Sequence, residues 1–443
     1  MLKKIISLLI LRYFRFLARL QLRKNPQATI VGVTGSAGKT SARLAIVQIL
    51  KTKGVVRHST HANSESGIPL NILGLAPTSY SSLDWLRLIV IAPWQLLTNW
   101  EHFNYYVVEM GIDSPAYPKN MDYLLSIVSP HIALVLNAGL SHSADFDYVV
   151  KDVNPTRRAR KLIKLIATEK MKLARSLGSR GVAIVNIDQP ELAGQLGGLK
   201  ARQLTIGKSS KARLRIMGTR INHQGSRFVF AYQSQKYELV LNDIFSPSYA
   251  YTFAGAIAVG SALGVSPKVS IAALSSYHAP AGRLRRFSGL SGSTIIDSSY
   301  NASPIGMQEA LSLLSTLGAK HHKIAVIGDM NELGLSGKLA HKQLADWIKD
   351  SCDEVLLFGD LTGDYTLPVL KEQKFRVHHF THMLGLTKFL RDQLNNKSLV
   401  LVKGSQNGIL LERAVESILA DPSDVARLCR RGPYWDQLRA KTT

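Results

Sequence analysis

The sequence predicts an α/β protein with two parallel-sheet domains, the first carrying a hairpin-rich insert and the second Rossmann-like and doubly wound. Three observations predict it. Short β-rich apolar runs recur between helical stretches over residues 28–186, alternating strand-like sequence fills residues 202–241, and a second series of apolar runs follows residue 287. A chain of 443 residues is also too long for one ordinary core.

In the first half, four apolar runs are expected to be strands of a mostly parallel sheet. They are TIVGV at 29–33, YYVVEM at 105–110, IALVLN at 132–137 and VAIVN at 182–186. The stretch SRFVFAYQSQKYELVL, within residues 202–241, indicates hairpins in an insert or subdomain. The sequence AGAIAVGSALGV at 254–265 then predicts a buried helix that returns to the main body.

The last third contains five further strand-like runs. They are STIID at 293–297, KIAVIG at 323–328, EVLLFG at 354–359, FRVHHF at 375–380 and SLVLVKG at 398–404. Helical stretches separate them, as in a doubly wound domain. We therefore divide the chain into a basic amphipathic helix at 1–27, a central domain at 28–280 and a C-terminal domain at 281–443. A cleft between two such domains is a common place for a ligand.

The chain is strongly basic, with 55 Lys and Arg against 31 Asp and Glu and a net charge of +24. Such a surface attracts anions, whether nucleotides, nucleic acid or acidic lipid headgroups, and the plainer alternative is a basic surface without a specific partner. The two cysteines, Cys352 and Cys429, are too few for a disulfide framework and fit a reducing compartment.

Two stretches are unusually apolar for their position. Residues 1–24 mix Ile, Leu and Phe with seven basic residues, and their uncharged run at 5–11 is too short to span a bilayer. They also lack the cleavage site of a signal peptide. This helix is expected either to lie in a membrane interface or to pack on the protein body. Residues 83–103 carry Trp85, Trp94 and Trp100, for which burial in a core is slightly preferred over a membrane interface.

A phosphate-binding loop follows the first strand. In IVGVTGSAGKTSARLAI, a strand, a glycine-containing turn and a helix come in the order of a P-loop. The predicted nucleotide-binding residues are Gly35, Ser36, Ala37, Gly38, Lys39, Thr40 and Ser41. Lys39 would reach the β- and γ-phosphate oxygens and the Thr40 hydroxyl would bind Mg²⁺. The strict pattern has glycine where this chain has Val33, but the strand–loop–helix context still predicts nucleotide binding.

Polar residues end the neighbouring strands. Glu109 closes the run at 105–110, where a P-loop metal usually gains a carboxylate, so we prefer a metal ligand to a solvated acid. Asn137 and His142 follow the next strand at the same edge. A structural role and a metal-binding role are equally expected for His142.

The motifs taken together resemble the Mur ligases. GVTGSAGKTS, EMG, SPHIALVLNAGLSH, TEKMKLA, GVAIVNID, IIDSSYNASPIGMQEAL, IAVIGDMNELG and LVKGSQN occur in the order found in that family, over nearly all of residues 30–436. The SYNASP and GDMNELG pieces are most similar to the branch that adds D-alanyl-D-alanine to UDP-N-acetylmuramoyl-tripeptide in peptidoglycan synthesis. The resemblance implies a central ATP-binding domain, and amide-bond formation through an acyl phosphate with ADP and phosphate as products.

The resemblance also implies roles for individual residues. Lys39 and Thr40 would hold phosphate and a first Mg²⁺ with Glu109, and His142 would bind a second Mg²⁺. Lys170 matches a lysine that the family often carries as a carbamate, although its sequence context alone favours an ordinary surface lysine. Arg283 would clamp phosphate from across the cleft.

Other residues would contact the nucleotide or the substrates. The nucleotide contacts implied by the resemblance are Asp297, Tyr300 and Asn301, and the substrate contacts are Asn63, Ser64, Glu65, Lys403 and Ser405. Asp329 and Glu332 would shape the same edge, unless they are helix caps or first-turn charges.

The chain departs from the family pattern in three places. About thirty residues precede the P-loop, where family enzymes have a domain that holds the UDP-sugar. Family members usually have His-Asn and a further Asn where this chain has Ser248, Tyr249 and Thr252, so Tyr249 or Tyr251 is a candidate for stacking on adenine. The basic run NPTRRARKLIKLI lies in extra length before Lys170 and forms either a solvated helix face or a clamp for an anion.

We expect a cytoplasmic monomer that ligates a short peptide to a muramoyl peptide, with a peripheral membrane contact at the inner face of the cell membrane if residues 1–24 bind lipid. Two alternatives stay open. One is a ligase of the same superfamily with another peptide or amino-acid acceptor, and the other is a catalytically silent ATP-binding scaffold. Nucleic acid is not an expected partner, because no basic motif with interleaved aromatic residues is present in the sequence.

Overall fold

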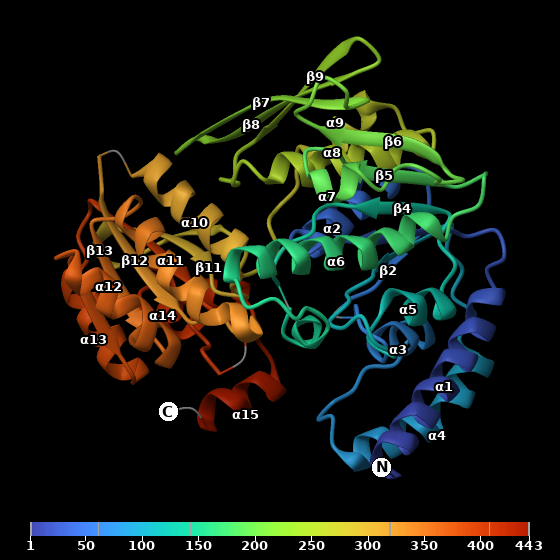
Figure 1. The fold of residues 1–443 in the computed structure, drawn as a ribbon, viewed down its shortest axis with the longest axis horizontal. Coiled ribbons are helices and arrows are strands. Elements are labelled where there is room, and N and C mark those ends of the chain that lie inside the picture. The colour runs from blue at the N-terminus through green and yellow to red at the C-terminus, as the bar shows by residue number, and fades with distance from the viewer. Residues whose placement is uncertain (1, 61, 142, 319, 407, 442–443) are drawn as a thin grey trace.

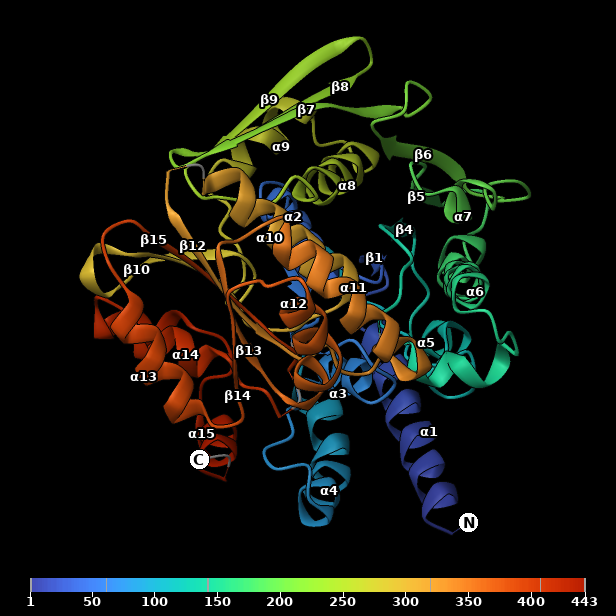
Figure 2. The same cartoon turned by 60° about the vertical axis from the view of Figure 1, so that its left-hand side comes forward.

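Two β-sheets, each covered by helices on both faces, make up the computed structural model (Figure 1 and Figure 2). The structure describes residues 2–60, 62–141, 143–318, 320–406 and 408–441. The α/β fold with parallel sheets that the sequence predicts is confirmed.

Within the described residues, the first sheet has nine strands in the order β2-β3-β1-β4-β5-β6-β7-β8-β9. Their bounds are β1 Thr29–Thr34, β2 Val56–His58, β3 Tyr105–Glu109, β4 Ile132–Val135, β5 Val182–Asn186, β6 Arg202–Gly207, β7 Leu214–Asn222, β8 Gly225–Tyr232 and β9 Gln235–Leu241. The pairs from β2 to β7 are parallel, and β8 is antiparallel to both of its neighbours. The predicted hairpins therefore extend the main sheet through β6 and do not form a separate subdomain.

Helices cover this sheet on two sides because the strand residues alternate between two cores. Val31 and Val107 belong to the core that contains residues of α2 and α8, whereas Tyr106 and Val108 belong to the core that contains residues of α5 and α6. The helices of this part are α2 Lys39–Leu50, α5 Met121–Ile127, α6 Pro155–Arg175, α7 Pro190–Ala193, α8 Tyr249–Ala262 and α9 Pro267–Leu274. Helix α8 is apolar around most of its circumference and is buried, as residues 254–265 predict.

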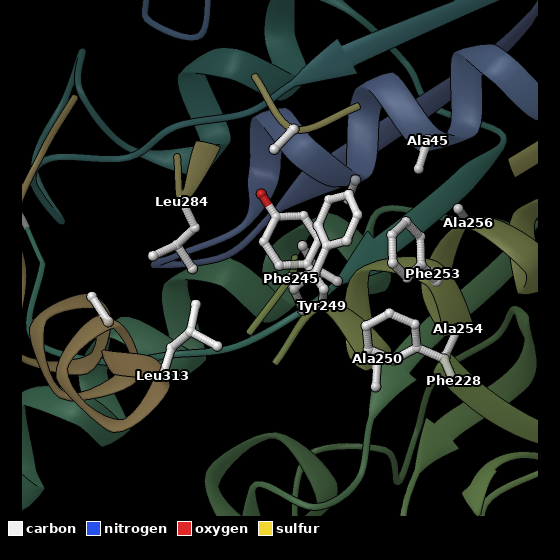
Figure 3. Packing of buried hydrophobic residues seen from close by; sticks show 14 of the residues in the cluster. Ala45, Phe228, Phe245, Tyr249, Ala250, Phe253, Ala254, Ala256, Leu284 and Leu313 are labelled. Atoms are coloured by element: carbon white, nitrogen blue, oxygen red, sulfur yellow. The ribbon is translucent and has the colours of Figure 1, made fainter. Parts of the chain in front are cut away.

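An aromatic cluster fixes α8 next to the site. Phe245 and Tyr249 have ring centroids 4.8 Å apart, and Phe228 and Phe253 have centroids 5.2 Å apart. Figure 3 shows these rings together with Leu284 and Leu313 from the C-terminal half of the chain. One hydrophobic core therefore continues from the first sheet to the helices of the second.

The second sheet has six strands among the described residues, in the order β10-β11-β15-β12-β13-β14. Their bounds are β10 Arg285–Ser288, β11 Thr294–Ser298, β12 His322–Gly328, β13 Glu354–Phe358, β14 Val377–Phe380 and β15 Ser398–Lys403. The five predicted strands pair in parallel, and the short strand β10, which was not predicted, adds an antiparallel edge.

Helices also lie on both sides of the second sheet. Residues of α10 and α11 contribute to the core shared with the first sheet, and residues of α13 and α14 form a separate core on the other side. The helices of this part are α10 Pro304–Leu317, α11 Gly337–Lys349, α12 Leu367–Glu372, α13 Met383–Gln393, α14 Glu412–Ser417 and α15 Pro433–Lys441.

Two long helices, α1 Leu2–Arg23 and α4 Ser82–Thr98, project from one end of the molecule (Figure 1 and Figure 2). Phe14 and Leu17 of α1 pack against α4 and against the short helix α3, Gly67–Leu73. The preferred burial of the tryptophans is wrong for Trp94 and Trp100, which are 66% and 62% exposed. Of the described helices, none is long and apolar enough to cross a membrane.

Candidate active site

A cavity of about 550 Å³ lies where the carboxyl ends of strands from the two sheets face each other. The first sheet contributes the loop after β1 and residues at the ends of β3, β4 and β5, and the second contributes residues at the ends of β11 and β15. Ligands bind at this edge in parallel α/β sheets, because loops and helix N-termini gather there. The cavity therefore lies where the predicted cleft was expected.

The predicted P-loop forms one wall of the cavity. Gly38 precedes α2 with a φ of 79°, a conformation that glycine adopts without strain. The Asn137 side chain holds the loop from both sides, since its Oδ1 accepts from the Ala37 N–H at 2.8 Å and its Nδ2 donates to the Ala37 carbonyl at 3.1 Å. The loop is thus fixed by a residue from the end of the neighbouring strand.

Lys39 is the first residue of α2, and its side chain folds back over the loop. Its Nζ donates to the Gly35 carbonyl at 2.7 Å. Burial in the cavity wall lowers the pKa of Lys39, while the carboxylate of Glu109 opposes that shift. A polyphosphate bound at this loop would contact both the Lys39 amine and the N-terminus of α2, which itself favours anions.

Glu109 lies beside the Thr40 hydroxyl. The Thr40 Oγ1 donates to Glu109 Oε2 at 3.1 Å, and Arg43 Nε donates to Glu109 Oε1 at 2.7 Å. The Glu109 carboxylate is nearly fully buried, and the paired Arg43 offsets its charge. A hydroxyl and a carboxylate oxygen together are ligands that suit Mg²⁺. In the part of the chain that the structure describes, no group of three or more His, Cys, Asp or Glu side chains forms a metal site.

Lys170 is buried on α6 and lines the same cavity, so it is not the ordinary surface lysine that its sequence context suggests. Burial lowers the pKa of Lys170 well below its usual value, and the positive charge of Lys39 lowers it further. The adjacent Glu169 is engaged elsewhere, because it accepts from the Met121 N–H at 3.0 Å. His142, the predicted partner of Lys170 at a second metal, lies outside the described residues.

Arg283 reaches the P-loop from the segment that precedes β10. Its Nη2 donates to the Thr40 Oγ1 at 3.3 Å. Its guanidinium carbon lies 4.5 Å from the centroid of the Tyr300 ring, within the range of a cation–π contact. The second half of the chain therefore places a permanent positive charge over the loop.

Lys403, at the end of β15, is buried in the opposite wall. Its Nζ donates to the Ser298 hydroxyl at 3.2 Å and to the Asn301 carbonyl at 2.9 Å. Burial lowers the pKa of Lys403 to about 8, an effect that the nearby Glu309 carboxylate opposes. Burial in turn raises the pKa of Glu309, which accepts from the Ser248 hydroxyl at 2.8 Å.

Tyr249 and Tyr251, the two candidates for stacking on adenine, differ in how closely their rings are packed. The Tyr249 ring packs in the aromatic cluster, and its hydroxyl lies 3.1 Å from Ser41 Oγ. Tyr251 is half-buried at the cavity and donates to Asp188 Oδ2 at 2.7 Å. Tyr251 is therefore the better candidate for a contact with a base.

Some predicted residues lie away from the cavity wall. Asp297 is fully buried and accepts from the Ser299 N–H at 3.0 Å and from the Ser299 hydroxyl at 2.6 Å. Ser405 accepts from the Asn331 N–H at 2.8 Å, behind the wall. Ser64 and Glu65 also lie outside the lining, whereas Asn63 belongs to it.

The two acids of GDMNELG have different surroundings. The Asp329 carboxylate accepts the N–H groups of Leu361 and Thr362, so it ties the loops after β12 and β13 together. Glu332 lines the cavity with a φ of 63°, and its carbonyl accepts from the Ser143 N–H at 3.1 Å. Asp329 therefore has a structural role in connecting these loops, and its side chain does not line the cavity.

Three cavity features were missed from the sequence. The sequence did not predict that Asn137 would hydrogen-bond to the P-loop. It also did not predict the hydrogen bonds from Tyr251 to Asp188 and from Ser248 to Glu309. Asp188 comes two residues after the end of the buried strand β5, so the strand-end argument that selected Glu109 applies to it as well. Glu309 lies inside α10 and carries no comparable signal in the sequence.

Comparison with known proteins agrees with this architecture. Residues 282–406 match a family model described as "Mur ligase, glutamate ligase domain". The chain is 27% identical over 401 residues to the UDP-N-acetylmuramoyl-tripeptide–D-alanyl-D-alanine ligase of Bacillus subtilis, which covers 89% of this chain and 76% of that protein. The chain is similar to Mur ligases over most of its length. The enzyme of the same name from Rickettsia prowazekii is 24% identical to it over 405 residues, covering 89% of this chain and 79% of the relative.

Solved structures resemble this chain over most of its length. MurF from Acinetobacter baumannii superposes with a TM-score of 0.72 at 21% identity, covering 93% of this chain and 79% of that one. MurF ligase from Thermotoga maritima in complex with ADP gives a TM-score of 0.71 at 21% identity, covering 97% and 84%. These likenesses confirm the α/β fold class.

Proposed function

We propose that this protein is an ATP-dependent ligase that adds D-Ala-D-Ala to a muramoyl-tripeptide, the reaction for which its curated relatives are named. One observation carries the proposal. The P-loop hydroxyl of Thr40 contacts both the Glu109 carboxylate and Arg283 from the other half of the chain. A triphosphate at this loop would thus be enclosed by charged groups from both sheets, as phosphoryl transfer requires.

The proposed reaction has two steps. A carboxylate oxygen of the muramoyl peptide attacks the γ-phosphorus of ATP, the bond to the bridging oxygen breaks, and ADP leaves. The amine of D-Ala-D-Ala then attacks the carbonyl carbon of the acyl phosphate, and the tetrahedral intermediate releases phosphate while the nitrogen loses a proton. Lys39 and Arg283 would stabilise negative charge on the phosphate oxygens, and the two walls would hold the reactants together.

Mg²⁺ fits the oxygen ligands of this site. Thr40 and Glu109 would hold it, and the ion would neutralise phosphate charge when bound. Lys170 suits the predicted carbamate, because burial favours the neutral amine that adds CO₂ and releases a proton. The resulting carboxylate is the group expected to bind a second Mg²⁺ together with His142.

The substrates would occupy the rest of the cavity. Asn63 is proposed to face the muramoyl peptide, Tyr300 and Asn301 the nucleotide, and Lys403 the incoming dipeptide or the acceptor. Asp297, Ser64, Glu65 and Ser405 would act only by positioning neighbouring residues. The proposal includes a monomer in the cytoplasm, with a peripheral contact at the inner face of the cell membrane through residues 1–24.

An ADP-release assay with UDP-muramoyl-tripeptide and D-Ala-D-Ala tests the proposal. We expect ADP release that requires both substrates and is lost in Lys39→Ala. The matched control is Lys51→Ala, an exposed lysine at the other end of α2, which should keep full turnover. Release that requires a different acceptor would identify another ligase of the superfamily. Nucleotide binding without release for any acceptor would favour the scaffold.

A further inference from the structure

One face of α4 is apolar and uncovered. The residues at helical spacing on this face are Leu83, Leu86, Val90, Trp94 and Leu97, which are between 57% and 79% exposed. The opposite side of α4 packs on α1 through Leu88 and Ala92, which are fully buried. An exposed apolar strip of this length normally marks a binding surface, because water solvates it poorly.

The exposed face of α1, the helix that packs beside α4, combines apolar and basic residues. Ile5, Leu9 and Phe16 are 49%, 57% and 60% exposed. Arg12, Arg19 and Arg23 are also exposed and share the same side of the helix, at the three- and four-residue spacing that places side chains together. The face therefore offers positive charge next to apolar surface.

Acidic residues are nearly absent from this part of the chain. Glu65 and Asp84 are the acids in residues 1–84. The Asp84 carboxylate is buried, accepts the N–H groups of Thr78 and Ser79, and pairs with Arg87 at 2.8 Å. No acid on α1 or on the apolar face of α4 offsets the arginines, within the part of these helices that the structure describes.

The two helices run side by side in the same direction. Phe14 lies 6.1 Å from Trp85, near the start of α4, and Lys24 lies 4.2 Å from the ring of Trp100, just after its end. Figure 1 and Figure 2 show both helices extending away from the rest of the molecule. We call the exposed residues of the two helices the α1–α4 surface: Ile5, Leu9, Arg12, Phe16, Arg19, Arg23, Leu83, Leu86, Val90, Trp94 and Leu97.

We infer that the α1–α4 surface binds a lipid bilayer that contains anionic headgroups. The apolar side chains would enter the boundary between headgroups and acyl chains, Trp94 would sit at that boundary, and the arginines would contact lipid phosphates. A second copy of this chain fits the surface less well, because a symmetric contact would bring arginines together. The inference does not depend on the ligase reaction, since the surface lies outside the cavity.

Vesicle co-sedimentation tests the inference. The full chain should bind phosphatidylcholine vesicles that contain about 30% phosphatidylglycerol, and bind pure phosphatidylcholine at least about tenfold more weakly. The variant Leu86→Asp, Val90→Asp, Leu97→Asp keeps Trp94 as a fluorescent reporter and should lose at least about tenfold in binding, along with the blue shift of its emission.

The control variant Val153→Asp, Val269→Asp, Leu384→Asp makes the same charge change at exposed apolar positions elsewhere and should bind like the wild type. The variant Arg12→Gln, Arg19→Gln, Arg23→Gln should lose its preference for phosphatidylglycerol, whereas Arg180→Gln, Lys200→Gln, Lys211→Gln should keep it. Circular dichroism checks that all variants are folded.

Several results would overturn the inference. Absence of vesicle binding at physiological salt would do so, and so would equal losses in the surface and control variants. A dimer in sedimentation velocity that the α4 variant abolishes, with no vesicle binding, would show that a second copy covers the surface instead.

Discussion

Arg283 and Thr40 lie 243 residues apart in the sequence, yet the guanidinium of the first donates to the hydroxyl of the second at 3.3 Å. The Tyr300 ring lies under the same guanidinium at 4.5 Å and limits its movement. This contact brings a fixed positive charge from the second half of the chain to the N-terminus of α2.

Replacing Arg283 with alanine should lower kcat/KM for ATP by about 100-fold, because a charge that stabilises the transferring phosphoryl group is lost. Steady-state ADP release measures the effect. Arg286→Ala is the matched control, since its guanidinium donates to the His223 carbonyl, away from the cavity lining, and it should change the rate less than about threefold. Equal losses in both variants would contradict a role for Arg283 at phosphate.

Lys170→Ala should lower ligation by at least about 100-fold, and wild-type activity should rise when bicarbonate is added to CO₂-depleted enzyme. The reason is that a neutral buried amine can form the carbamate proposed to bind the second metal. Lys164→Ala, on the exposed side of the same helix, is the control. A ¹³C NMR carbamate signal should be present in the wild type and absent from Lys170→Ala; full activity in this variant would leave Lys170 without a catalytic role.

Lys170 should also lower the free energy of unfolding. Burial lowers the pKa of Lys170 below its unfolded value, so the unfolded chain binds more protons and the free energy of unfolding rises with pH up to the unfolded pKa. Lys170→Met should therefore raise this free energy at neutral pH by about 1–3 kcal/mol in the absence of Mg²⁺ and bicarbonate, and by less near pH 10. Urea unfolding at the two pH values measures it, and a constant difference would contradict the shift.

Lys403 should give the pH–rate profile a basic limb, that is, a fall in kcat/KM at high pH. Its pKa is lowered to about 8 by burial, so the ammonium is present below that value and is lost as the pH rises through it. If the ammonium holds an anionic substrate, kcat/KM for D-Ala-D-Ala falls above about pH 8. Lys403→Arg keeps its charge and should remove this limb, whereas the exposed Lys397→Arg should leave it in place. An unchanged profile in Lys403→Arg would assign the limb to another group.

Much of the cavity follows from a simple rule about sheets. The P-loop follows β1 and Glu109 ends β3, and parallel strands deliver such residues to one edge of a sheet, so their meeting was predictable. Lys170 was not predictable from its own neighbourhood, because its burial depends on how α6 packs on the first sheet. Only the resemblance to the Mur ligases selected it.

Other features depend on packing that sequence patterns do not carry. Strand β10 contains two arginines and is held by pairing with β11, so no apolar run marks it. The hairpin strands join the main sheet because β6 pairs with β7, a pairing that local alternation cannot reveal. Trp94 was assigned to a core because tryptophan is usually covered, whereas the residues that the structure describes cover α4 on one side and leave Trp94 exposed.

Helix α3 gives the protein a built-in spacer. It begins four residues after Asn63, which lines the cavity, and its own Leu70 and Leu73 pack on α1 and α4. Seven helical residues span about 10 Å. A protein bound to a bilayer through α1 and α4 would therefore hold its cavity at a fixed distance from the lipid surface. The distance that an acceptor can reach from the bilayer would then limit which acceptors are used.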